Sequence, residues 1–180
     1  MSVDPVIAWS LRIALAALFV TAAWHKLSDR QRFETAVRAY ELLPARAPSL
    51  LSWSLPAVEV AIAAGFFYPA SQRPAAIAAA AVLLLYTGAI AVNLARGRRA
   101  IDCGCFAARS ATPLSGALVA RNVVLIAAAS ALLLPVEIRT LVWIDGLTLV
   151  ATLLTLSLLW GATQRLSQTG HVLRRAGGIQ

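Results

Sequence analysis

The two cysteines of the chain are separated by one residue, in the segment Cys103-Gly104-Cys105. Side chains two residues apart do not face each other in a helix, and in a strand they lie roughly 6.6 Å apart, near the upper limit for a disulfide. A turn is therefore needed to join them, and Gly104 supplies the backbone freedom for it. A disulfide of this kind would be strained and easily reduced, as catalytic disulfides are. The spacing thus indicates a thiol-redox pair.

Two other interpretations of the cysteines stay open. In a loop that faces the reducing cytoplasm they would be two inert thiols. Zinc normally takes four ligands, and the histidines His25 and His171 are the only further soft ligands in the chain. A metal site would therefore need a second copy or a partner, and no metal site is predicted within one chain.

Glu59 and Arg121 are ionisable residues inside long apolar runs. At 1.5 Å per residue they lie roughly 13 Å and roughly 10 Å from the starts of their runs. Both runs start from the same face, so the two side chains reach similar depth and are expected to pair, with Asn122 and Asn93 as further polar candidates. Ionisable residues within a membrane usually face the bundle interior. We interpret the pair as one that fixes helix order, with a proton or substrate path as the alternative.

Two further charged residues are given no chemical role: Lys26 is expected to be structural, and Asp145 is structural or of unknown role. Asp145 lies roughly 6 Å into the last apolar run, where its side chain can reach water. Lys26 follows Trp24 and His25 near the end of the first run, and we expect it to anchor the membrane interface.

The elements that position these residues are apolar runs of membrane-spanning length. AVILMFWYC residues make up 59% of the chain and charged residues only 13%, against roughly a quarter charged in soluble domains. This predicts an all-α, polytopic membrane helical bundle with about five transmembrane helices and no separate soluble domain. The predicted spans are 6–27, 50–68, 74–95, 114–134 and 141–162, and a polar cytoplasmic tail is expected over 164–180.

A short amphipathic helix is expected between the first two spans, lying on the membrane surface. Ser28 and Gln31 fit the capping-box pattern that starts a helix. Apolar residues then recur at helical spacing up to Pro44. They are Phe33, Ala36, Val37, Tyr40 and Leu43.

The net charge of +8 comes from cations in the loops between apolar runs, where they meet lipid headgroups rather than nucleic acid. One predicted face receives only Arg73 and Arg139. The positive-inside rule therefore predicts a bacterial inner-membrane protein with a periplasmic amino terminus and a cytoplasmic carboxyl terminus. The cysteine loop then lies at the cytoplasmic face. The cations of that face are Lys26, Arg30, Arg32, Arg38, Arg46, Arg96, Arg98, Arg99, Arg109, Arg165, Arg174 and Arg175.

Several motifs resemble the methylamine-utilisation protein family MauE, within a wider group of MauE- and DoxX-like redox-associated membrane proteins. The resemblance extends along most of the chain and is most specific at Cys103-Gly104-Cys105-Phe106 with Arg121-Asn122 downstream. The glycine that commonly follows the phenylalanine is Ala107 here. The remaining matches are Lys26-Leu27 with Asp29 and Phe33, Tyr40-Glu41-Leu42-Leu43-Pro44, and Pro56 with Glu59.

The resemblance implies a role in maturing methylamine dehydrogenase, whose small subunit carries several disulfides and a quinone made from its own tryptophans. It also implies a thioredoxin-like partner and a periplasmic client, whereas charge counting places the cysteines at the cytoplasmic face. Electron exchange with a cytoplasmic or quinone donor, or a loop folded back into the bundle, would reconcile the two.

The resulting hypothesis is a membrane accessory factor, rather than a stand-alone enzyme, with Cys103 and Cys105 as its redox pair. The alternatives are a small transporter or ion-handling bundle that uses Glu59 and Arg121, and a non-catalytic scaffold. The sequence contains no nucleotide-binding glycine loop and no hydrolase motif. No cofactor is identified, and a quinone is chemically compatible although no motif supports it.

Overall fold

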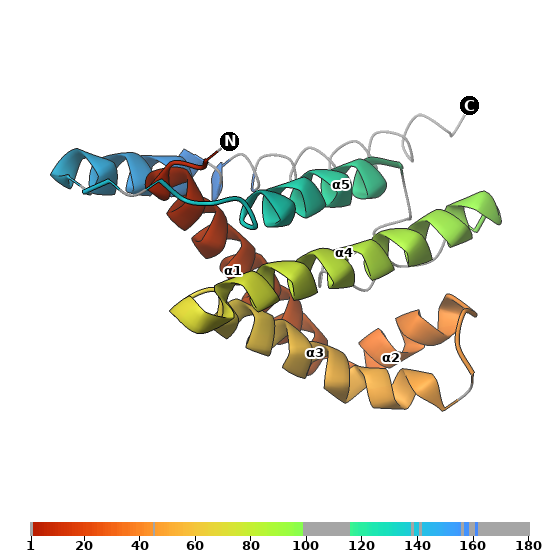
Figure 1. Ribbon diagram of the computed structural model, residues 1–180. Helices are drawn as coiled ribbons and strands as arrows, with labels where there is room; N and C mark the ends of the chain where they lie inside the picture. Colours follow the sequence, from red (N-terminus) through yellow and green to blue (C-terminus); the bar gives the residue numbers. More distant parts are fainter. Residues whose placement is uncertain are drawn as a thin grey trace.

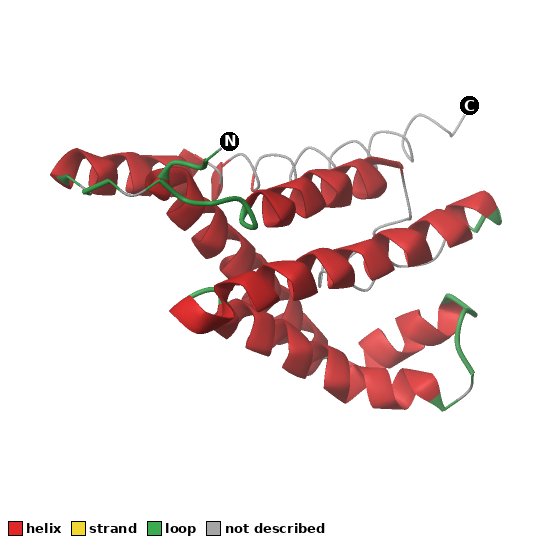
Figure 2. Ribbon diagram, viewed as in Figure 1, coloured by secondary structure: helices red, strands yellow, loops and turns green. Residues whose placement is uncertain are grey.

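The computed structural model describes residues 2–44, 46–98, 116–137, 139–140, 142–155, 157–158 and 161, and these residues form helices joined by short connections (Figures 1 and 2). The all-α prediction is confirmed. Among the described residues, strand-like pairing is limited to one isolated bridge between Val3 and Val136. The elements are α1 (Pro5–Ser28), α2 (Arg30–Ala39), α3 (Ala47–Gly65), the 3-10 turn η1 (Pro69–Ser71), α4 (Gln72–Ala95), α5 (Gly116–Ala131) and a further helix, Trp143–Thr155.

Among the described residues, three helical segments are long and apolar enough to cross a membrane: α1, α3 and the segment Pro69–Ala95. Helix α5 and the helix Trp143–Thr155 are also apolar, but their described parts are shorter. The protein is therefore a helical membrane protein, as predicted. Five crossings, the sidedness and the polar tail stay predictions, since the described residues do not test them.

The bundle core is built from small side chains. Helix α1 packs against α3, α3 against α4, and α4 against α5. Alanines such as Ala16, Ala63, Ala76 and Ala79 are buried at these contacts, beside the larger Phe19. Small residues let helix backbones approach closely, which is how membrane helices gain packing energy when lipid supplies no hydrophobic driving force.

The amphipathic helix exists as α2, with one correction to its start. Asp29, not Ser28, is its cap, because the Asp29 carboxylate accepts a hydrogen bond from the Arg32 amide at 3.1 Å. Ser28 instead completes α1. Helix α2 ends at Ala39, and Glu41 then adopts a left-handed backbone conformation with φ of 49°. Asp29 is the one residue between α1 and α2, and α2 packs against α3 after this short junction.

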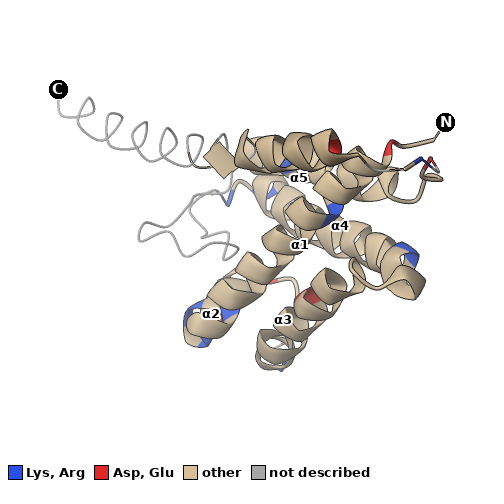
Figure 3. Cartoon of the chain, turned by 90° about the vertical axis from the view of Figure 1, so that its left-hand side faces the viewer, with Lys and Arg blue, Asp and Glu red and all other residues tan. Residues whose placement is uncertain are grey.

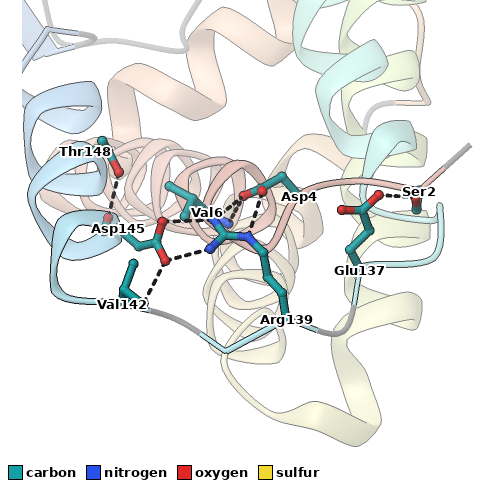
Figure 4. Close-up of polar contacts among 8 residues, drawn as sticks. All are labelled: Ser2, Asp4, Val6, Glu137, Arg139, Val142, Asp145 and Thr148. Carbon is teal, nitrogen blue, oxygen red and sulfur yellow. Dashed lines mark hydrogen bonds and ion pairs between the residues drawn. The ribbon is translucent and has the colours of Figure 1, made fainter.

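The chain start and the segment after α5 are tied together by what we call the N-terminal strap (Figure 4). Arg139 forms ion pairs with Asp4 at 3.0 Å and with Asp145 at 2.8 Å. Backbone hydrogen bonds join Val3 to Pro135 at 2.9 Å and Glu137 to Val3 at 3.0 Å. Asp145, expected near the outer end of a span, is thus a structural anchor. The strap comprises Ser2, Val3, Asp4, Pro135, Val136, Glu137, Arg139 and Asp145.

The described connections lie at two ends of the bundle. The amino terminus, η1 and residues 132–137 lie at one end, and α2 and the end of α4 lie at the other (Figure 1). Lys and Arg gather on α2, whereas the bodies of the long helices carry few charged residues (Figure 3).

Candidate functional site: a buried ion-pair cluster

Glu59 lies in the interior of the bundle, where it forms an ion pair with Lys26. Lys26 Nζ lies 2.5 Å from Glu59 Oε1, and the two side chains are 1% and 0% exposed. Lys26 comes from the last turn of α1, and Glu59 comes from α3, three residues after Pro56. Removal of either charge would leave the other buried without compensation, which is strongly unfavourable.

A third helix contributes a hydroxyl to the same carboxylate oxygen. Tyr86, on α4, donates from its hydroxyl to Glu59 Oε1 at 2.6 Å. The Lys26 ammonium also lies 5.1 Å from the centre of the Tyr86 ring and 5.5 Å from the centre of the Phe33 ring of α2, within cation–π range. We call Lys26, Glu59 and Tyr86 the ion-pair cluster. With Phe33 it joins α1, α2, α3 and α4 at one point.

Helix α5 reaches the cluster across a small cavity. The cavity has a volume of about 20 Å³, and its lining includes the ion-pair cluster together with Arg121 and Asn122. Such a volume holds about one water molecule. Arg121 Nη2 lies 3.4 Å from Asn122 Oδ1. Glu59 Oε2 is buried and has no hydrogen-bond partner among the described residues.

The structure therefore brings Glu59, Arg121 and Asn122 to one place, while the ion pair described for Glu59 is with Lys26. Asn93 is not part of this group. It is fully buried near the end of α4, and its amide donates to the backbone oxygen of Ala89 at 3.0 Å. The function of these residues stays a prediction.

The expectation that Lys26 anchors the membrane interface is wrong. Its side chain is buried because α1 packs against α3. Glu59 is the one acidic residue in α3, and it pairs with Lys26 there. Tyr86 was not anticipated. The sequence signal for Tyr86 was its phenol hydroxyl in an apolar run, because a buried tyrosine hydroxyl usually has a hydrogen-bond partner.

Cys103 and Cys105 lie outside the described residues, but the chain on either side is described. Arg98, just past α4, pairs with Glu41 at 2.5 Å and donates to the Ala39 carbonyl at 3.5 Å. The Arg98 hydrogen bond lowers the pKa of the Glu41 carboxyl. Gly97 has a φ of 74°, which glycine adopts without strain. Arg98, the last described residue before the cysteines, is thereby joined to the end of α2, and α5, the first described helix after them, packs on α4.

The cluster does not resemble a metal centre. Among the described residues there is no group of three or more His, Cys, Asp or Glu side chains. Its opposite charges instead form a compact hydrogen-bonded group in a low-dielectric interior, where each interaction is stronger than in water.

These features define a class of protein: a helical membrane bundle whose helices converge on a buried Lys–Glu–Tyr cluster and which carries a cysteine pair between α4 and α5. The model of the family "Methylamine utilisation protein MauE" matches residues 4–135, which include the whole cluster and both cysteines. The chain belongs to this family.

Curated relatives support the same assignment. The chain is 50% identical to the methylamine utilization protein MauE of Paracoccus versutus over 134 residues, which cover 73% of this chain and 72% of the relative. It is 45% identical to MauE of Paracoccus denitrificans over 130 residues, 72% and 70% of the two chains. Identity to MauE of Methylorubrum extorquens is 37% over 162 residues, 89% and 87% of the two chains. No solved structure matches the chain.

Proposed function

We propose that this protein is a membrane accessory factor that matures, processes or stabilises the disulfide-rich small subunit of methylamine dehydrogenase by thiol redox at Cys103 and Cys105. A thioredoxin-like protein and the small subunit are its proposed partners. It would reside in the bacterial inner membrane with a periplasmic amino terminus and a cytoplasmic carboxyl terminus. Membership of a methylamine-utilisation family and the cysteine spacing support this proposal.

The proposed chemistry is thiol–disulfide exchange. A client thiolate attacks the Cys103–Cys105 disulfide, and one cysteine leaves as a thiolate. A second client thiolate then attacks the mixed disulfide. The client becomes a disulfide, and the cysteine pair, having received two electrons, becomes a dithiol. To return to the disulfide, the cysteine pair must transfer two electrons and two protons to an acceptor. A thioredoxin-like partner in its disulfide form is one class of acceptor.

One structural observation carries the proposal: the helices before and after the cysteines both reach the buried cluster. Helix α4 contributes Tyr86, and α5 contributes Arg121 and Asn122 to the shared cavity. Arg98 additionally ties the chain beyond α4 to Glu41. A reactive pair requires support from the surrounding fold, and these contacts hold the two helices that flank the cysteines in the sequence.

The test is the accumulation of the mature client in cells that carry Cys103→Ser or Cys105→Ser. Each substitution should abolish accumulation while the membrane level of this protein stays normal. Thr112→Ser, in the same segment, is the matched control and should leave the client at its wild-type level. Normal client levels in both cysteine variants would refute the redox role.

A second candidate function, ion or proton handling, is favoured by one observation. Glu59 Oε2 has no hydrogen-bond partner among the described residues, and Glu59 lines a cavity that holds about one water. In that case Glu59→Gln would eliminate pH-dependent flux into proteoliposomes, and both cysteine variants would behave as wild type.

A further inference from the structure

A second and much larger cavity lies beside the ion-pair cluster, between α2, α3 and α4. Its volume is about 520 Å³, within the range of roughly 300–1,000 Å³ typical of small-molecule sites. Phe33 and Val37 line it from α2, Leu51 and Leu55 from α3, and Val82 and Ile90 from α4. We propose that this cavity binds the head of a neutral, lipid-soluble quinone, with the Lys26 ammonium as the donor to a quinone carbonyl.

Two members of the ion-pair cluster, Lys26 and Tyr86, line this cavity and also line the small one. An ammonium has three N–H donors, and the described acceptor oxygen for Lys26 is Glu59 Oε1. Lys26 therefore retains donor capacity for a ligand oxygen, although its side chain is 99% removed from solvent.

The charge of the cluster selects a neutral ligand. Glu59 already balances Lys26 within the bundle. An anionic headgroup or fatty acid would add an uncompensated charge to a low-dielectric site, which is costly. A plain acyl chain has no acceptor for Lys26. A quinone carbonyl provides an acceptor without charge.

The route to the cavity selects a lipid-soluble ligand. Leu84 and Leu85 line the cavity, yet they are 57% and 72% exposed. Both lie on α4, which is apolar enough to span a membrane, so their exposed surface faces lipid. A ligand would enter from the bilayer, where quinones partition.

Binding of the quinone does not depend on the cysteines. One consequence rests on the proposed function: a bound quinone would accept two electrons and two protons from the cysteine dithiol, giving quinol and the disulfide. It would thus supply the acceptor class that the exchange reaction requires.

The test measures binding of decylubiquinone to the purified full-length protein in nanodiscs, by equilibrium titration. Gly88 lines the cavity, and a Cβ added there meets no atom within 4 Å. Gly88→Leu should therefore fill the cavity and weaken binding at least tenfold. Gly116→Leu is the matched control, because Gly116 also has open space around it and does not line the cavity. It should bind as wild type.

A second cavity-filling variant, Ala89→Leu, covers the case in which Gly88→Leu does not fold. Both cysteine-to-serine variants should retain binding, so a failed redox role and a failed quinone site give different results. Absence of saturable binding to the wild type, equal binding by Gly88→Leu, Ala89→Leu and wild type, or equal competition by stearate and decane would each overturn the proposal.

Discussion

At the residue scale, the ion pair between Lys26 and Glu59 determines how the helices converge. Its two charges are fully removed from water, and Tyr86 holds the shared carboxylate oxygen. Such pairs are weak evidence for net stability, because desolvation offsets the attraction, but loss of one partner is severe. We infer that the pair specifies the arrangement of α1 and α3 more than it stabilises the bundle.

This distinction leads to a first prediction about single and double substitutions. Glu59→Leu or Lys26→Met alone should lower the free energy of unfolding by about 3–5 kcal/mol, because each leaves an uncompensated buried charge. The double variant Lys26→Met/Glu59→Leu should recover most of that loss. Titration with SDS in mixed micelles measures the free energy of unfolding of the two single variants and the double variant. Additive losses in the double variant would contradict the account.

Part of this cluster could be predicted from the sequence. The fixed rise of a helix gave the depth of Glu59 and Arg121, and both do line one cavity in the interior. The partnership with Lys26 could not be predicted, because it depends on how α1 crosses α3 and on how far the lysine stem extends. Neither quantity is encoded in hydrophobic periodicity.

At the element scale, the contact between α3 and α4 depends on small residues next to η1. A Cβ added at Gly65 would lie 2.9 Å from the Ala75 Cβ, closer than real Cβ atoms approach. The Ser71 hydroxyl also donates to the Gly65 carbonyl at 3.0 Å. Since neither Ala75 nor the backbone can move freely, the two helices would have to separate.

A second prediction follows for Gly65→Ala. Overpacking should lower the free energy of unfolding by about 1–3 kcal/mol. Gly146→Ala, in the helix Trp143–Thr155, is the control, because a Cβ there meets no atom within 4 Å. It should be neutral or stabilising by up to about 1 kcal/mol through helix propensity. Equal effects of the two substitutions would show that the close approach of α3 and α4 is unimportant.

The helix positions were largely predictable because uninterrupted apolar runs end at charged or proline-containing segments. The start of α2 was misplaced by one residue, since Ser28 and Asp29 are both good caps and only the continuation of α1 decides between them.

At the scale of the whole molecule, the N-terminal strap joins segments 135 residues apart in the chain. Hydrogen bonds from Arg139 and from the Val6 amide lower the pKa of Asp4 below its ordinary value of 3.8. The sequence predicted that Arg139 and Asp145 lie near one face. It did not predict their contact with Asp4, because pairing across 135 residues of chain depends on the complete fold.

The strap gives a third prediction, for pH dependence. The pKa of Asp4 is lowered in the folded protein. Its contribution to the stability of the strap is therefore complete above the ordinary pKa and is lost as the pH falls through the lowered pKa. Protection of the Val3 and Glu137 amides, corrected for intrinsic exchange, should fall severalfold between about pH 5 and pH 3. Arg139→Gln should lack this protection even at neutral pH. Arg73→Gln, a cation outside the strap, should resemble wild type, and equal protection in both variants would contradict the role of Arg139.

The redox state of Cys103 and Cys105 in intact cells, measured by acid quenching and a maleimide mass shift, decides whether the pair exchanges disulfides with a client. An impermeant maleimide applied from each side reports their accessibility. Thiol–disulfide exchange predicts a disulfide that becomes a dithiol when the small subunit is expressed, and a mixed disulfide with the client when Cys103 or Cys105 alone is replaced by serine. Cysteines that stay fully reduced with and without the client, and form no mixed disulfide, would contradict it.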